Sequence, residues 1–364
     1  MVKGAVLEEV GKPLVIKDFP MPKPERGAII CKISLATICG SDLHTWRRER
    51  IIPTPVILGH EYTGTIYALG EGVKEDFAGN HVEIGDKVVN CTIAYCNNCY
   101  MCNVKRTPTM CPNTRQLSRF TCDKPPHLFG GFAEYVYIPP GFAFFKAPEG
   151  VPDEALATAN CALGTIVHSY EKAGLEIGDS VVIQGVGGLG LYGTALAKRI
   201  GASKVITIDQ VEDRLKLSEE FGADHTINML EYKTPEEREK RVKELTGGWG
   251  ADLVVDVSGT PKAIPEGVKM LRKGGRYLEI GCVFPNALFQ IDAILFPYSE
   301  ISITGVRLYE PRHLWKGLKF LEETRDIYPY KKLVSHKFKL EEINRAFELF
   351  DQRKVLRPGI IPAE

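Results

Sequence analysis

Four cysteines crowd into the short stretch YCNNCYMCNVKRTPTMCPN. Three of them recur at every third residue and the fourth follows a basic loop; they are Cys96, Cys99, Cys102 and Cys111. In a reducing compartment disulfides are uncommon, and clustered thiols more often bind a metal or take part in catalysis. If the protein is not secreted, this stretch predicts a metal-binding or catalytic lobe.

A second set of thiol and imidazole groups is spread along the chain. Cys39 lies in ATICGSDLHTW, His60 in VILGHEYTG and Cys161 in TANCALGTIVHSY. Two thiolates and one imidazole can hold zinc and leave a fourth position for water or substrate. Taken singly, each cysteine is also an ordinary small core residue, and a buried histidine needs only a hydrogen-bond partner. Spacing alone does not decide whether the three residues meet.

A glycine-rich turn follows an apolar strand in VVIQGVGGLGLYGTALAKRIG. Gly185, Gly187 and Gly190 stand in G-x-G-x-x-G register and open a helical pattern. Such a loop presents free N–H groups and the positive end of a helix dipole to a pyrophosphate. The next strand, KVITID, ends in Asp209, where a dinucleotide fold places the acid that binds the adenosine ribose. Asp209 would repel a 2′-phosphate, so the pattern favours NAD over NADP. The alternative is a tight strand–helix turn without a ligand.

These residues need two kinds of scaffold. Up to about residue 148 the chain alternates apolar and polar positions between glycine and proline breaks, which predicts antiparallel strands. Later, short apolar strands such as SVVIQGV and KVITID alternate with helical patterns such as EDRLKLSEEFGA. Continuous apolar strands between amphipathic helices predict a parallel sheet covered on both faces. The fold class is therefore α/β, preceded by a β-rich domain.

Composition narrows the possible partners and the compartment. The chain has 364 residues, enough for two domains, and its 46 Lys+Arg balance its 46 Asp+Glu. A chain without net charge has no global field that would hold nucleic acid or an anionic membrane. The N-terminal stretch lacks the apolar segment and cleavage site of a signal peptide, and no apolar run is long enough to span a bilayer. We therefore expect a cytoplasmic protein that binds neither nucleic acid nor membrane.

Six motifs in a fixed order resemble a known family. CGSDLH, GHE, GDKV, the cysteine cluster, GVGGLG and the Asp-ended strand occur in the order of zinc-dependent medium-chain alcohol dehydrogenases. The resemblance covers essentially the whole chain. It implies a β-rich, chaperonin-10-like catalytic domain at 1–155, a Rossmann-type NAD-binding domain at 156–304, and a return to the catalytic domain at 305–364, with the active site in the cleft. It also implies a homodimer or homotetramer.

The resemblance assigns roles around the catalytic zinc. Cys39, His60 and Cys161 are similar to its ligands, although some relatives have Glu where this chain has Cys161. Glu61 is similar to a carboxylate that can approach the metal, and Asp42 to an acid that orients the ligating histidine. Ser41 and His44 are similar to the proton relay.

The same resemblance assigns the cofactor contacts. Thr165 lies where relatives contact the nicotinamide side, and Arg357 lies where they reach the pyrophosphate. The remaining cofactor-binding positions are those of the glycine loop, the ribose-binding acid and a nearby arginine: Gly185, Gly187, Gly188, Leu189, Gly190, Asp209 and Arg214.

The cysteine cluster resembles the structural zinc lobe of the family, at about residues 91–115. Four thiolates close the tetrahedron and leave no position for substrate. The gap between the third and fourth cysteines is one residue longer than usual, which a loop can absorb. An iron–sulfur cluster and redox-active thiols are the alternative uses of this spacing. We interpret the other cysteines as structural; they are Cys31, Cys91, Cys122 and Cys282.

The implied function is reversible oxidation of a primary or secondary alcohol to an aldehyde or ketone, with hydride transfer to NAD and two zinc ions per chain. A polyol or an acidic alcohol is an alternative substrate. Arg47, Arg48 and Arg50 follow the relay histidine, and they either select an anionic substrate or form a solvated basic loop. A zinc-free quinone or enoyl reductase and a non-enzymatic nucleotide-binding protein are the competing classes.

Overall fold

The computed structural model describes residues 1–362, which form two compact units. The first unit combines Met1–Gly164 with the C-terminal segment from Tyr309 onward, and the second is Thr165–Leu308. No helix within residues 1–362 has both the length and the apolar character that crossing a membrane requires.

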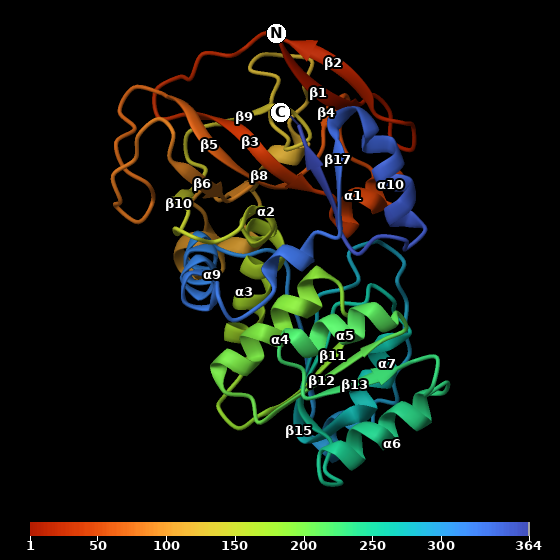
Figure 1. Ribbon diagram of the computed structural model, residues 1–364. Coiled ribbons are helices and arrows are strands. Elements are labelled where there is room, and N and C mark those ends of the chain that lie inside the picture. Colours follow the sequence, from red (N-terminus) through yellow and green to blue (C-terminus); the bar gives the residue numbers. More distant parts are fainter. Residues whose placement is uncertain (363–364) are drawn as a thin grey trace. The chain divides into compact units, whose positions relative to one another are not determined.

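The first unit is built on mainly antiparallel sheets, in which only the described pair β17 and β18 is parallel (Figure 1). Its main sheet has the order β10 (Phe144–Lys146), β6 (Lys87–Asn90), β5 (Glu61–Leu69), β3 (Ile29–Thr37), β18 (Pro358–Ile361) and β17 (His336–Lys339), and β9 (Tyr135–Ile138) also pairs with β3. The smaller sheets are β2 (Val15–Phe19), β1 (Val2–Leu7) and β4 (Val56–Ile57), and the pair β7 (Ile93–Ala94) and β8 (Arg115–Gln116). The expected antiparallel strands are therefore present.

The first unit also contains helices, from both of its chain segments. Its α-helices are α1 (Gly40–Trp46) and α2 (Asp153–Thr158), and the C-terminal segment adds α9 (Pro311–Thr324) and α10 (Ile343–Asp351). Short helical turns complete it: η1 (Tyr100–Val104), η2 (Pro108–Met110), η3 (Leu117–Arg119), η4 (Ala159–Leu163), η5 (Tyr330–Leu333) and η6 (Leu340–Glu342). Because β18 lies beside β3, the last strand of the chain is held next to the segment that leads into α1.

The second unit contains the predicted parallel sheet. Its strand order is β13 (His225–Asn228), β12 (Lys204–Asp209), β11 (Ser180–Gln184), β14 (Ala251–Asp256), β15 (Leu271–Glu279) and β16 (Ser302–Gly305). Its helices are α3 (Gly164–Ala173), α4 (Gly188–Ile200), α5 (Glu212–Glu220), α6 (Pro235–Leu245), α7 (Ala263–Met270) and α8 (Leu295–Ser299). All its pairings are parallel, and the order is that of a doubly wound dinucleotide-binding fold.

Helices cover both faces of this sheet. Ile183 faces α4, because its side chain lies next to the positions where Gly190 and Gly193 would carry a Cβ. The preceding residue, Val182, belongs instead to the core cluster that includes Val242 of α6 and Val268 of α7. Successive side chains of a strand point to opposite faces, so α4 lies on one side and α6 and α7 on the other. The predicted fold class is confirmed.

Candidate active site and metal centres

Asp42 fixes the first two residues of the candidate catalytic cluster. Cys39 precedes α1, and its backbone N–H donates to Asp42 Oδ2 at 3.0 Å. The other carboxylate oxygen, Oδ1, lies 3.2 Å from Nδ1 of His60. Asp42 is buried, and through these two hydrogen bonds its carboxylate positions both the Cys39 segment and the imidazole of His60. A hydrogen bond through Nδ1 leaves Nε2 of His60 to bind a metal.

The structure brings the dispersed thiols and the imidazole together. The ligand atoms of Cys39, His60, Glu61 and Cys161 all lie within 4.8 Å of one another. The two sulfurs are 4.0 Å apart. Zinc–sulfur bonds of about 2.3 Å with tetrahedral angles place two thiolates about 3.8 Å apart, so this separation fits zinc.

Glu61 is held by two polar side chains. Its Oε2 accepts hydrogen bonds from Thr37 and from the guanidinium of Arg357, and both charged side chains are buried. Its other oxygen, Oε1, has no hydrogen-bond partner among residues 1–362. A buried carboxylate oxygen without a partner is costly, and a metal ion beside the two thiols would satisfy it. The donor set therefore fits a zinc ion that Glu61 can approach.

The groups of the cluster shift one another's pKa values. The hydrogen bond from Cys161 and the neighbouring His60 hold the pKa of the Cys39 thiol well below its usual value. Burial opposes the charging of His60, but the carboxylate of Asp42 and the thiolate of Cys39 outweigh it and raise the pKa of His60 well above its usual value. Burial raises the pKa of Glu61 to about 7, although Arg357 acts in the opposite direction. A thiolate is the form that binds a metal.

The two expected relay residues lie on α1. Ser41 Oγ is 3.4 Å from Nε2 of His60, so the hydroxyl lies at the nitrogen that faces the cluster. His44, one turn later, contacts the carboxylate of Glu49 through Nδ1 and is partly exposed. One hydroxyl is thus at the cluster and one imidazole can exchange protons with solvent. Sequence reasoning gave no role to Glu49.

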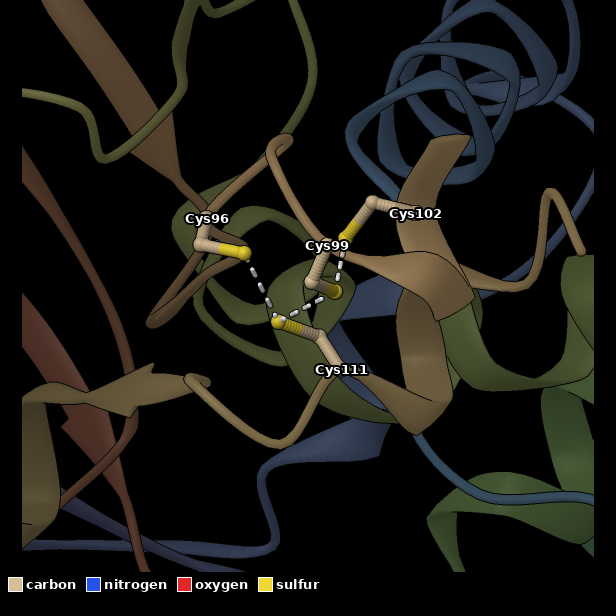
Figure 2. Close-up of side chains that lie close together, drawn as sticks. All are labelled: Cys96, Cys99, Cys102 and Cys111. Carbon is tan, nitrogen blue, oxygen red and sulfur yellow. Dashed lines mark hydrogen bonds between the residues drawn. The ribbon is translucent and has the colours of Figure 1, made fainter. Parts of the chain in front are cut away.

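The four-cysteine lobe forms a second cluster, and its sulfurs point toward one another (Figure 2). The sulfur of Cys99 lies 3.4 Å from that of Cys102 and 3.9 Å from that of Cys111. Cys111 is 3.4 Å from Cys96. These separations surround the value of about 3.8 Å expected for tetrahedral zinc thiolates. The longer gap before Cys111 does not prevent the sulfurs from meeting.

Two amide groups donate hydrogen bonds to a sulfur of this lobe and stabilise its thiolate form. The backbone N–H of Asn98 lies 3.5 Å and the side-chain amide of Asn113 lies 3.6 Å from the sulfur of Cys96. These two hydrogen bonds lower the pKa of the Cys96 thiol to about 6. Amide donors around ligating thiolates are the outer contacts that a thiolate metal site requires. The residues present fit a closed structural zinc site.

The glycine loop of the second unit has the shape that the motif predicts. Gly185 has a positive φ of 97°, and a Cβ there would lie 2.8 Å from the Cα of Ser258. A Cβ on Gly190 would lie 2.1 Å from the carbonyl oxygen of Gly185. Gly187 directly precedes α4, with Gly188 and Leu189 in its first turn. The loop therefore turns tightly and ends at a helix N-terminus.

Asp209 ends β12 beside this loop. Its Oδ2 accepts a hydrogen bond from Val186 N at 2.8 Å, and its Oδ1 accepts from Gln210 N at 2.7 Å. The carboxylate is thus fixed by backbone donors at the carboxyl edge of the sheet. Arg214 lies in the first turn of α5, and Thr165 is buried near the start of α3. Both belong to the second unit, and neither is part of a metal cluster.

The basic loop after α1 is engaged within its own unit. Arg47 contacts the carboxylate of Asp351, and Arg48 donates to the carbonyl of Val10 and to Glu9. These contacts favour the interpretation of a structural basic loop over one that selects an anionic substrate. Trp46, which directly precedes this loop, is also engaged, because its ring stacks on that of Phe347.

Comparisons with known proteins agree with this arrangement. Residues 25–149 match the family described as alcohol dehydrogenase GroES-like domain, and residues 188–323 match zinc-binding dehydrogenase. The chain is 34% identical over 346 residues to 5-exo-hydroxycamphor dehydrogenase of Pseudomonas putida, covering 94% of each chain. It is 34% identical over 362 residues to L-threonine 3-dehydrogenase of Thermococcus kodakarensis, covering 97% of this chain and 95% of that one.

A solved structure extends the match to the whole chain. The alcohol dehydrogenase TM0436 of Thermotoga maritima superposes with a TM-score of 0.93 at 33% identity, covering 100% of this chain and 99% of that chain. Identity above 30% over nearly the full length, two matched domains and the metal-ligand geometry lead to one conclusion. The chain belongs to the zinc-dependent medium-chain alcohol dehydrogenase family.

Proposed function

We propose that this dehydrogenase oxidises an alcohol reversibly to a carbonyl compound, using one catalytic zinc ion and NAD. The observation that carries the proposal is the convergence of Cys39, His60 and Cys161, which supply two thiolates and an imidazole at one point. A catalytic zinc site has three such ligands and keeps a position open for substrate. The four-cysteine lobe would hold a second, structural zinc ion.

The residues around the cluster have distinct tasks in this reaction. When bound, zinc supplies the Lewis acidity that makes a substrate hydroxyl acidic, and NAD supplies the hydride acceptor. Ser41 would take the hydrogen bond from the substrate hydroxyl, because its Oγ lies at the cluster-facing nitrogen of His60. His44 is partly exposed and would exchange the proton with solvent. Asp42 keeps His60 oriented through Nδ1.

The preference for NAD over NADP is proposed from Asp209. Its carboxylate stands at the end of β12 and is held there by backbone N–H groups, so it cannot easily turn away. A fixed negative charge accepts hydrogen bonds from ribose hydroxyls and repels a 2′-phosphate. The glycine loop and the N-terminus of α4 would receive the pyrophosphate, with Arg214, Thr165 and Arg357 as further cofactor contacts.

A secondary alcohol is the substrate class that we propose first. The named substrates of two relatives, a hydroxycamphor and the 3-hydroxyl of threonine, are secondary alcohols. Arg47 and Arg48 already have partners, which argues against an anionic group as the main determinant. A neutral secondary alcohol therefore takes precedence over a primary or an acidic one.

Assembly and compartment are proposed on separate grounds. The edge strand β16 and the apolar side chains before it, among them Phe289 and Tyr298, are exposed, which supports a homodimer or a larger homo-oligomer. All ten cysteines are free thiols, which supports a reducing compartment such as the cytoplasm.

The proposal is tested by an alcohol panel. Purified enzyme is assayed for reduction of NAD and of NADP with primary, secondary, polyol and acidic alcohols, alongside Ser41→Ala. We expect turnover with NAD and secondary alcohols, and a loss of turnover in Ser41→Ala without loss of zinc. Reduction of quinones or enones by the wild type, with no alcohol oxidised in any condition, would contradict the proposal.

A further inference from the structure

A third group of potential metal ligands lies in the second unit, apart from both zinc clusters. Asp256 ends β14 and Glu279 ends β15, and these two residues are direct partners in the parallel register. Cys282 follows three residues after Glu279. The ligand atoms of the three residues lie within 4.8 Å of one another. The group therefore stands at the carboxyl edge of the sheet, where ligands of doubly wound folds bind.

Each carboxylate has one oxygen that is fixed and one that is not. Asp256 Oδ1 accepts hydrogen bonds from Ser258 N at 2.7 Å and from Ser258 Oγ at 2.6 Å. Glu279 Oε1 accepts from Cys282 N at 2.7 Å. In ligating carboxylates, outer hydrogen bonds of this kind fix one oxygen and direct the other to the metal.

The remaining oxygens are buried, and no residue of the described part of the chain donates a hydrogen bond to them. Asp256 is fully buried, and its Oδ2 has no hydrogen-bond partner among residues 1–362; the same holds for Oε2 of Glu279. The arginines of strand β15 are engaged elsewhere, Arg272 with Asp252 and Arg276 with Asp179. Two carboxylates this close need either a shared proton or a cation between them.

The thiol favours the cation. A shared proton involves the two carboxylates alone, whereas a metal ion would use all three groups. A thiolate beside two carboxylates suits zinc and similar transition metals better than magnesium or calcium. Glu279 and Cys282 are only half-buried, so an ion and its remaining water ligands can reach the site.

We propose that Asp256, Glu279 and Cys282 bind a divalent transition-metal ion, for which zinc is the probe. The site also adjoins the glycine loop, because a Cβ on Gly185 would meet the backbone of Ser258, the residue that fixes Asp256. A cation there neutralises two carboxylates behind the loop that faces the anionic pyrophosphate. The consequence is tighter cofactor binding by the metal-loaded site.

The test is the zinc content of the full-length enzyme, which does not depend on alcohol turnover. Wild type is equilibrated with zinc, freed of excess, and analysed beside Cys282→Ser and Glu279→Gln. We expect one zinc per cluster, hence three per chain in the wild type, and one fewer in each variant. Cys31→Ser is the matched control, since Cys31 is buried in the other unit and belongs to none of the clusters.

Two results would overturn the proposal. Equal zinc content in wild type, Cys282→Ser and Glu279→Gln means that the carboxyls share a proton or that any extra zinc binds elsewhere. Circular dichroism shows whether Glu279→Gln is folded. If it is not, the zinc content of the milder variant Cys282→Ser alone tests the proposal. As a second readout, the Kd for NAD measured by fluorescence should weaken several-fold in Glu279→Gln; a lost zinc ion with an unchanged Kd overturns the link to cofactor binding.

Discussion

The guanidinium of Arg357 contacts the carboxylate of Glu61, although 296 residues separate them in the chain. The pair is buried, with Arg357 6% and Glu61 0% exposed at the side chain. Thr37 donates to the same carboxylate oxygen. The strand pairing of β18 with β3 thus brings a C-terminal arginine to the candidate catalytic cluster, where it pairs with the carboxylate of Glu61.

Replacing Arg357 by Ala should destabilise the enzyme strongly. The change leaves Glu61 buried without its charged partner, and breaking a buried ion pair on one side costs about 3–5 kcal/mol. Denaturant unfolding of both proteins measures the difference in free energy. Arg47→Ala is the control, because Arg47 and its partner Asp351 are each about one-third exposed and such a pair contributes less than ~1 kcal/mol. Equal losses in the two variants would contradict the role of the buried pair.

Asp42→Asn should weaken the catalytic zinc without affecting the four-cysteine lobe. An amide cannot accept hydrogen bonds through both of its atoms, so either Cys39 N or His60 Nδ1 loses its acceptor. Loss of an orienting carboxylate lowers metal affinity about 10–100-fold. Competition with a chelator measures the affinity of the weaker zinc ion. An unchanged affinity, or an equal loss from both sites, would show that Asp42 does not position these ligands.

Asp209→Asn should reduce the preference for NAD. The amide can still accept from Val186 N, so the loop keeps part of its support, but the charge that repels a 2′-phosphate is gone. Losing one or two charge-assisted hydrogen bonds to the ribose lowers kcat/KM with NAD about 10–100-fold. Asp213→Asn removes an exposed charge four residues later and is the control. If the ratio of NAD to NADP kcat/KM changes no more in Asp209→Asn than in Asp213→Asn, Asp209 does not select the cofactor.

Stability at acidic pH should depend on Asp252. Burial alone would raise the pKa of this carboxyl, but hydrogen bonds from Ser180 and the guanidinium of Arg272 outweigh burial and lower the pKa. A lowered pKa gives stability that is complete above the unfolded pKa of about 3.9 and is lost as the pH falls through the folded value. Asp252→Asn should therefore cost about 1–3 kcal/mol at pH 7 and less below about pH 4. A difference that stays constant over this range in pH-dependent unfolding would contradict the assignment.

Local patterns were sufficient to predict the fold class and the cysteine lobe. Continuous apolar strands between amphipathic helices indicated the parallel sheet, and the spacing of the four cysteines indicated one lobe, because both signals lie within short stretches. The β-rich first unit was likewise expected from alternating patterns. The sequence predicts these features because each is determined by residues that lie close together in the chain.

Contacts between distant segments could not be derived from spacing. The pairing of Arg357 with Glu61 depends on where the last strand joins the sheet, which no local pattern encodes. Cys282 gives no signal of its own in the sequence, where an isolated cysteine indicates a structural residue. Its proximity to Asp256 and Glu279 depends on the register of two parallel strands. Two acids that each end an apolar strand, VVD and YLE, are the signal that could have indicated the site.

The central claim is that Cys39, His60 and Cys161 hold one zinc ion on which alcohol oxidation depends. Zinc content and NAD reduction by a secondary alcohol, measured on the same samples of wild type and Cys161→Ser, test it directly. We predict that the variant loses one zinc ion per chain and nearly all turnover while the four-cysteine lobe keeps its metal. Full turnover in a variant that lacks this zinc ion would contradict the account.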